Sequence, residues 1–248
     1  SLVTLILFIG TLSPASAKEI TIDELEPLVE RGVKVWAGVK DYTATFVKQE
    51  NVKGDLLEKE AVFMKHRVKP RSVYMKWTQD PHEGRETLFV EGKNDNEIKA
   101  HEGGLLGVVN VNLDPYGNMA RKENRHTVYQ AGIGTTVALV ATDLKRARER
   151  NEGTFEDLGM KSIEGLQMHC YKATFPDAEV KKSVKAQKGK YYSGNIQICM
   201  DPASGLPLSI EHRTAGGKLL EYYAYKNVKL NVGLTDKDFD PDNDDYRF

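Results

Sequence analysis

The residues of this chain that could do chemistry do not have the spacing of a familiar catalytic or metal-binding motif. Its six histidines could bind a metal or transfer protons, but the sequence contains neither His-x-x-x-His nor Cys-x-x-Cys. The segment His101-Glu102-Gly103-Gly104 begins like a zinc-protease motif, yet the second histidine is missing and the glycine pair would break the helix. Gly-x-Ser-x-Gly, the nucleophile turn of many hydrolases, does not occur. We therefore predict no catalytic residue, no metal site, no cofactor and no enzymatic activity. The histidines are His66, His82, His101, His126, His169 and His212.

Carboxylates near the C-terminus could in principle hold calcium. Aspartates recur between Asp236 and Asp245, but an EF-hand loop needs glycine at its sixth position, and the sixth residue from Asp236 is Pro241. We interpret this segment as a solvated tail, and the lysines between Lys181 and Lys190 as a solvated loop.

Composition excludes one class of partner and permits a packed core. The formal net charge is -1, which argues against nucleic acid, because phosphate binding needs a basic surface. Hydrophobic residues make up 40% and charged residues 29% of the chain, as in ordinary globular proteins.

The N-terminal stretch has the pattern of a secretory signal peptide. An apolar run from Leu2 to Leu12 precedes Ala15-Ser16-Ala17, a small-x-small cleavage site, and then charged Lys18. The run is shorter than the roughly 20 residues that span a bilayer. We predict a signal peptide over residues 1–17, a single domain over residues 18–248, and a mature protein that is soluble in the periplasm or otherwise secreted.

Two cysteines, Cys170 and Cys199, lie in strand-like segments of a chain predicted to reach an oxidising compartment. If the two strands form a hairpin through the lysine-rich connection, both sulfur atoms fall on the polar face. We favour a disulfide, and two separate thiols are the alternative.

Hydrophobic periodicity predicts an antiparallel α+β fold. Thr21-Ile22-Asp23-Glu24 has the pattern of a capping box that opens a helix, and a second helix is expected over residues 133–150. Period-two alternation begins at Asp41 and resumes after Thr154. Short connections favour antiparallel neighbours. The expected fold is an open half-barrel of about nine to eleven strands, covered by two or three helices.

One face of this sheet is expected to be apolar. The helices could fill that face completely, or they could leave a cavity, and methionines on neighbouring strands suit a surface that accepts variable apolar ligands. By alternation, this face carries Met64, Met75, Trp77, Leu88, Val90, Ile196 and Ile198.

Several short segments resemble one known family. The segment 41–49, Asp-Tyr-Thr-Ala-Thr-Phe-Val-Lys-Gln, resembles the first-strand pattern of the LolA-like superfamily, the periplasmic lipoprotein carriers and their relatives. Lys69-Pro70 followed by Trp77, and the segment 88–92, resemble the following strands and turn. The ends Gly205-Leu206-Pro207 and 234–239 are similar to related sorting proteins. The match is best to an uncharacterised bacterial branch with a domain of unknown function.

The resemblance implies a half-barrel cavity that holds an acyl chain, and a carrier or chaperone instead of an enzyme. The resemblance adds Phe46 and Lys69, which lie in the shared motifs, to the seven residues of the apolar face. These nine residues are the ones that we expect to bind the ligand. The implied partners are an acyl lipid or lipoprotein, with only transient membrane contact. An envelope sensor or scaffold that binds a protein partner is the alternative, and a secreted hydrolase is a weaker one.

The signal peptide gives a direct prediction. N-terminal sequencing of the exported protein should begin at Lys18, because the small-x-small site ends at Ala17. An intact N-terminus on protein recovered from the cytoplasm would contradict export.

Overall fold

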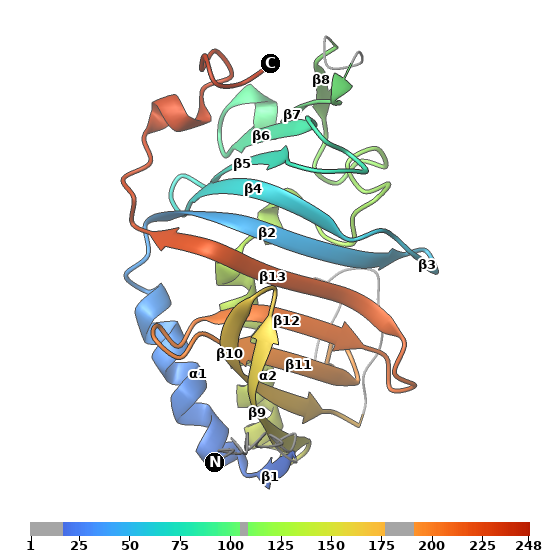
Figure 1. Cartoon of the computed structure of the whole chain (residues 1–248), viewed down its shortest axis with the longest axis vertical. Coiled ribbons are helices and arrows are strands. Elements are labelled where there is room, and N and C mark those ends of the chain that lie inside the picture. Colours follow the sequence, from blue (N-terminus) through green and yellow to red (C-terminus); the bar gives the residue numbers. More distant parts are fainter. Residues whose placement is uncertain (1–16, 105–108, 177–190) are drawn as a thin grey trace, which may run out of the picture.

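The computed structural model describes residues 17–104, 109–176 and 191–248, which form one large antiparallel sheet with two α-helices (Figure 1). The predicted signal peptide, apart from Ala17, and the lysine-rich segment 181–190 lie outside the described residues. The helices are α1 (Ile22–Trp36) and α2 (Ile133–Arg150), with 3-10 helices at Asn94–Asn96, Val128–Gln130 and Asp236–Phe239. The strands are β1 (Lys18–Ile20), β2 (Asp41–Val52), β3 (Asp55–Leu56), β4 (Glu60–Arg67), β5 (Ser72–Trp77), β6 (Glu86–Val90), β7 (Ile98–His101), β8 (Val111–Leu113), β9 (Thr154–Ile163), β10 (Leu166–Thr174), β11 (Asn195–Met200), β12 (Pro207–Arg213) and β13 (Leu219–Leu230).

The sheet is open and strongly curved. Its 13 strands run in the order β1-β9-β10-β11-β12-β13-β2-β4-β5-β6-β7-β8, with β3 paired to β2. The terminal strands β1 and β8 do not pair with each other in this order, so the half-barrel does not close. The predicted α+β half-barrel is confirmed. The observed sheet has more strands than the expected nine to eleven partly because β1, β3 and β8 have only two or three residues, too few for an alternation pattern.

Both helices begin where the sequence indicates. Thr21 caps α1 through a capping box with Glu24, and α2 occupies the predicted residues 133–150. The two helices meet where the Trp36 ring lies against Gly134. A Cβ atom at Gly134 would lie 2.4 Å from that ring, so the close approach depends on glycine.

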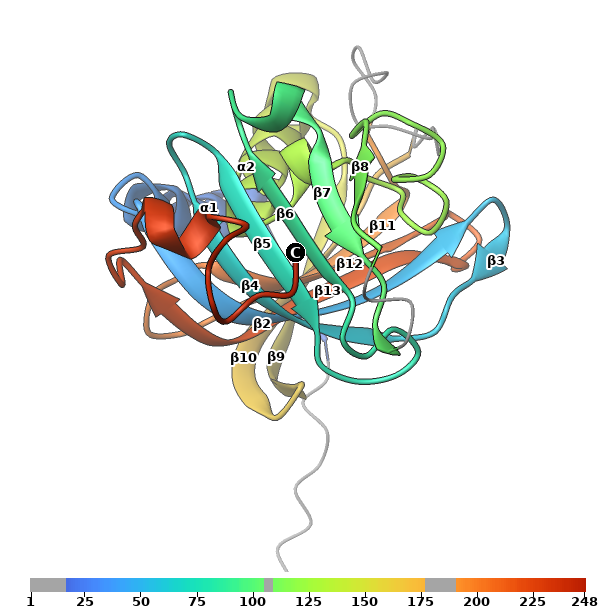
Figure 2. The ribbon, with the colours of Figure 1, turned by 90° about the horizontal axis from the view of Figure 1, so that it is seen from above.

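The helices lie on the inner side of the curved sheet (Figure 2), and they fill one half of it. Leu25 and Val29 of α1, with Val140 and Leu144 of α2, pack against β9 to β12 in a buried cluster. Ile196 and Ile198 of β11 belong to this cluster and are 2% and 4% exposed. The alternative in which the helices fill the apolar face therefore holds for this half of the sheet.

The outer face of the other half is covered by the C-terminal segment. Asp236 pairs with Arg67 at 2.7 Å, and Asp238 pairs with Lys65 at 2.9 Å. The ring of Tyr246 stacks on Tyr74 with centroids 3.9 Å apart. The aspartate-rich segment that we interpreted as a solvated tail is thus docked on the sheet by ion pairs and an aromatic contact.

Cys170 and Cys199 form a disulfide between β10 and β11, where they are directly paired. The predicted bridge is therefore present, but its surroundings differ from the expected polar face, since both residues are 0% exposed. The β9–β10 hairpin folds over this face, and its turn residue Glu164 accepts a hydrogen bond from Tyr222 of β13. Tertiary folding of the hairpin buries sulfur atoms that alternation alone placed near solvent.

Removing the disulfide should destabilise the protein. The bridge spans 29 residues of sequence, and a closed loop of that size contributes roughly 3–4 kcal/mol by restricting the unfolded chain. The double variant Cys170→Ala/Cys199→Ala should lose about this much free energy of unfolding in urea. Ser209→Ala, in the strand next to Cys199, is the control for a small buried substitution. Equal unfolding midpoints for the wild type and the double variant would contradict the prediction.

Candidate functional site

A cavity of about 820 Å³ lies between α2, the inner face of the sheet and the loop 114–131. Its walls come from α2 and from strands at both sides of the sheet centre, β2, β5 to β8, β12 and β13. The helices leave this half of the inner face uncovered, and the cavity occupies the space that remains.

Helix α2 has two different faces because residues three and four apart lie on the same side of a helix. Val137, Val140 and Leu144 face the core. Apart from Leu139, the residues on the cavity side are small or polar, so that α2 forms a wall without filling the space. The residues on this side are Thr135, Thr136, Ala138, Leu139, Thr142, Asp143 and Arg146.

The wall formed by β5 to β8 is mainly apolar, and strand register explains why. Met75 pairs with Thr87, Thr87 with Ala100, and Ala100 with Val111, so these four side chains form a row on one face. Trp77 and Ile98 extend the same surface. The cavity therefore has a continuous, largely apolar wall across four strands.

Exposed apolar side chains lie at the edge of the cavity. Val109 is 59% exposed and Met119 is 70% exposed, and both line the cavity. Val111 is 37% exposed. These exposed side chains continue the apolar lining to the edge of the cavity.

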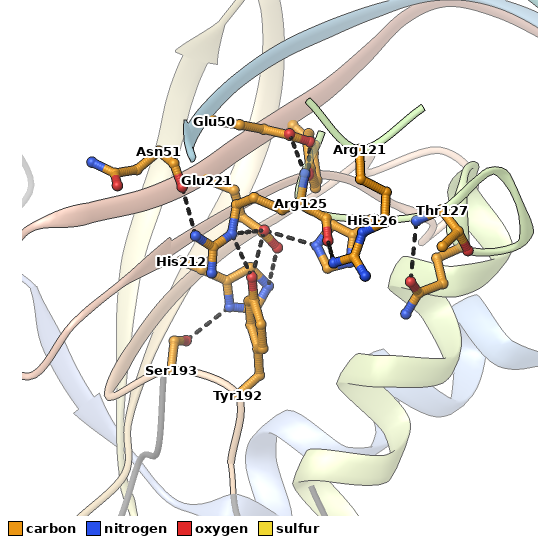
Figure 3. Close-up of polar contacts among 12 residues, drawn as sticks. Glu50, Asn51, Arg121, Arg125, His126, Thr127, Tyr192, Ser193, His212 and Glu221 are labelled. Carbon is orange, nitrogen blue, oxygen red and sulfur yellow. Dashed lines mark hydrogen bonds and ion pairs between the residues drawn. The ribbon is translucent and has the colours of Figure 1, made fainter. Parts of the chain in front are cut away.

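The opposite end of the cavity, at β12 and β13, is polar and is organised around Glu221 (Figure 3). This carboxylate is 2% exposed. It accepts hydrogen bonds from Tyr192 at 2.7 Å, from His126 at 2.8 Å and from Arg125 at 3.0 Å. The Arg125 guanidinium also donates to the carbonyl oxygen of Asn51 at 2.6 Å. Arg125 and His126 belong to the loop 114–131, so these bonds attach that loop to the sheet.

Burial and charge set the protonation of this end. Burial alone would raise the pKa of Glu221, but His126, His212 and Tyr192 outweigh it and lower the pKa to about 2. Burial would likewise lower the pKa of His126, yet the neighbouring Glu221 raises it above its ordinary value. Burial lowers the pKa of His212 to about 4 and raises the pKa of Asp143 on α2 to about 6.

Ser193, His212 and Glu221 superficially resemble a catalytic triad. Ser193 Oγ lies 2.8 Å from His212 Nδ1, but His212 Nε2 is 3.9 Å from the Glu221 carboxylate, too far for a hydrogen bond. Ser193 is 0% exposed and is not among the lining residues. A substrate in the cavity would not reach its hydroxyl group, so we interpret the trio as a structural contact.

Three of the residues predicted to bind ligand line the cavity: Phe46, Met75 and Trp77. Met64 is on the same face but is 0% exposed within the core, and Ile196 and Ile198 lie under the helices. Lys69 is exposed in the turn between β4 and β5.

The prediction that Leu88 and Val90 share this face is wrong. Leu88 pairs with Tyr74, which is one position away from Met75. Leu88 and Val90 pack with Phe239 of the C-terminal segment on the outer side. Alternation gives the faces within a strand, but a shift of one residue in pairing exchanges them.

Sequence reasoning missed the polar end of the cavity. His126 and His212 were seen only as scattered histidines, and Glu221 was not singled out. His212 pairs with Glu221 across the β12–β13 hairpin, so turn and register could have related these two residues. His126 is 95 residues from Glu221 in the sequence, and no local spacing connects this pair. Their contact follows from the position of the loop 114–131 over the sheet.

A family described as "Protein of unknown function (DUF1571)" matches residues 39–248. The chain belongs to this family. No curated protein matches the chain. The described residues contain no helix that is both long enough and apolar enough to cross a membrane.

Several solved structures are similar to this chain at low sequence identity. The lipoprotein LppX from Mycobacterium tuberculosis is 12% identical, with 87% of this chain and 99% of LppX covered and a TM-score of 0.50. A LolA superfamily protein from Nitrosomonas europaea is 10% identical, with coverages of 87% and 96% and a TM-score of 0.36. MucB of Pseudomonas aeruginosa, in its complex with MucA, is 14% identical with a TM-score of 0.43. The match covers 88% of this chain and 60% of MucB. At this identity the likeness to LppX concerns the fold alone.

Replacing Glu221 should show how much its ionised carboxylate stabilises the fold. A carboxylate whose pKa is about 2 in the folded protein, against an ordinary value of 4.5, stabilises the fold above about pH 4.5, and this stabilisation is lost as the pH falls toward 2. Glu221→Gln should reduce the free energy of unfolding at pH 7 by roughly 3 kcal/mol. The difference from the wild type should shrink between pH 4.5 and 3.

Glu149→Gln is the matched control, because the Glu149 side chain is 62% exposed on α2 and should change stability by less than about 0.5 kcal/mol. Urea unfolding across the pH range measures both variants. A difference between Glu221→Gln and the wild type that does not vary with pH would refute the assigned ionisation.

Proposed function

We propose that this protein is a non-enzymatic periplasmic binding protein that holds the acyl chain of a lipid or lipoprotein in the half-barrel cavity, as a carrier or chaperone. The observation that carries the proposal is the cavity of about 820 Å³ with its apolar row across β5 to β8. Its volume lies within the range of about 300–1,000 Å³ that is typical of small-molecule sites.

The energetics suit capture of a chain. Burying an acyl chain of about 16 carbons contributes on the order of 12 kcal/mol, at about 0.8 kcal/mol per methylene. Binding of that strength needs a route for release. The loop 114–131 forms part of the cavity wall and is attached to the sheet by the polar contacts of Arg125, so movement of this loop would open the cavity.

Two features support an extracytoplasmic location. The sequence pattern of residues 1–17 is that of a signal peptide, and the Cys170–Cys199 disulfide is typical of proteins in oxidising compartments. The exposed Val109 and Met119 at the cavity edge suit transient contact with a membrane from which a lipid is taken.

An envelope sensor or scaffold with a protein partner is the second candidate. The same exposed apolar edge could meet a protein surface. The two candidates differ in what accompanies the native protein: lipid in organic extracts for a carrier, or a stable protein complex without lipid for a scaffold.

A charge in the apolar wall should abolish binding. Met75→Glu places a carboxylate on the wall of the cavity, where an acyl chain would have to desolvate it. Displacement of a fluorescent fatty acid should show affinity reduced at least about tenfold, a loss of about 1.4 kcal/mol. Met160→Glu is the matched control, because Met160 on β9 is 52% exposed and is not a lining residue.

A second pair of variants tests volume instead of charge. Ala138→Trp extends a ring from α2 into the cavity, and Lys145→Trp places the same ring on an exposed part of α2 outside it. Only the first should weaken binding. Thermal unfolding of all four variants identifies any that fail to fold. A wild type that binds no acyl probe would overturn the proposal.

A further inference from the structure

If the cavity holds an acyl chain as proposed, its polar lining determines which head group the ligand can have. The lining changes along the cavity: the wall at β5 to β8 is largely apolar, whereas the end at β12, β13 and the middle of α2 carries His212, Glu221, Asp143 and Arg146. An amphiphile would match this gradient with its chain against β5 to β8 and its head group toward β12 and β13.

Charged side chains at the polar end are already paired with one another. Arg125 and His126 contact Glu221, and Arg146 lies 2.6 Å from Asp143. Glu50 accepts hydrogen bonds from the hydroxyl group of Tyr223 and, at 2.8 Å, from the backbone of Arg125. An ionised head group entering here would find its counter-charges engaged, and a buried charge without a partner is strongly unfavourable.

The same pairing holds nearer the apolar wall. Lys48 lies 3.5 Å from Glu60, and Arg85 lies 2.9 Å from Glu102 and 3.0 Å from Glu123. Within the described ranges, the half-buried and buried cations of the lining therefore face carboxylates of the protein itself.

Apart from Lys122, which is exposed, and His101, the remaining polar side chains of the lining are neutral. Hydroxyl and amide side chains can donate and accept hydrogen bonds without adding charge. At the polar end, His126 Nδ1, His212 Nε2 and Asp143 Oδ2 are buried and have no hydrogen-bond partner among the described residues, which leaves unused polar capacity around that end. The neutral lining residues are Thr87, Asn124, Thr127, Gln130, Thr135, Thr136 and Thr142.

We infer that the ligand is an amphiphile with an uncharged head group that carries hydroxyl or ester oxygens, of the acylglycerol type, and that this head group lies at the β12–β13 end of the cavity. Paired charges disfavour a free carboxylate or a quaternary ammonium group there. At that end, Thr142 of α2 and the unpartnered ring nitrogens of His126 and His212 provide hydrogen bonds to a neutral oxygen-bearing head.

A panel of competitors with one chain length tests the inference. Monolauroylglycerol, laurate and dodecyltrimethylammonium would displace the neutral probe N-phenyl-1-naphthylamine from the wild-type protein at pH 8, below their micelle concentrations. We expect the dissociation constant of monolauroylglycerol to be at least about tenfold lower than those of the two ions. Laurate or the ammonium ion binding as tightly as monolauroylglycerol would overturn the inference but leave the proposed function intact. If neither the probe nor any competitor binds, both fail.

A charge variant tests the physical reason. Glu50→Gln removes one negative charge from a residue that is 4% exposed and lines the cavity, while an amide oxygen can still accept hydrogen bonds. The ratio of laurate affinity to monolauroylglycerol affinity should rise at least about fivefold. Glu149→Gln, exposed on α2 outside the cavity, should leave the ratio unchanged. An unchanged ratio in a folded Glu50→Gln variant would show that charge pairing does not set the selectivity, and if that variant does not fold, the wild-type panel decides.

Discussion

The cavity depends on the ionic contacts that the buried Glu221 carboxylate makes with Arg125 and His126. A carboxylate that is 2% exposed is tolerated only when it is paired and fully hydrogen-bonded. Arg125 and His126 supply most of that pairing, and both come from the loop 114–131. The pairing of Glu221 in β13 with these two residues therefore holds the loop 114–131 against the sheet. This loop forms part of the cavity wall.

The cavity exists because two helices cannot cover a sheet of 13 strands. α1 and α2 pack on the inner face at β9 to β12, and the glycine contact at Trp36 brings the two helices close together. Packing them tightly against one half leaves the other half without a helical layer. There the mainly small and polar side of α2 meets a largely apolar row of the sheet. The resulting space is apolar on one side and polar on the other, as the proposed amphiphilic ligand requires.

The two halves of the candidate site differ in how far they could be predicted. Phe46, Met75 and Trp77 follow from alternation and from motifs within single strands, and they line the cavity. Leu88 and Val90 were misplaced because strand pairing, which the sequence does not display, sets the relation between β5 and β6. His126 could not be connected with Glu221, because it lies 95 residues away on the loop 114–131. His212 pairs directly with Glu221 across the β12–β13 hairpin, a local relation that the sequence reasoning did not use.

Local sequence determined the elements of this protein. The capping box at Thr21, the bounds of α2 and the period-two strands are set by hydrogen bonds and apolar periodicity over a few residues. Only the tertiary structure decided which half of the apolar face the helices fill, that the C-terminal aspartates dock on the outer face, and that the β9–β10 hairpin buries the disulfide. These outcomes depend on packing between segments far apart in the chain. Such packing is governed by register and shape complementarity, which local periodicity does not encode.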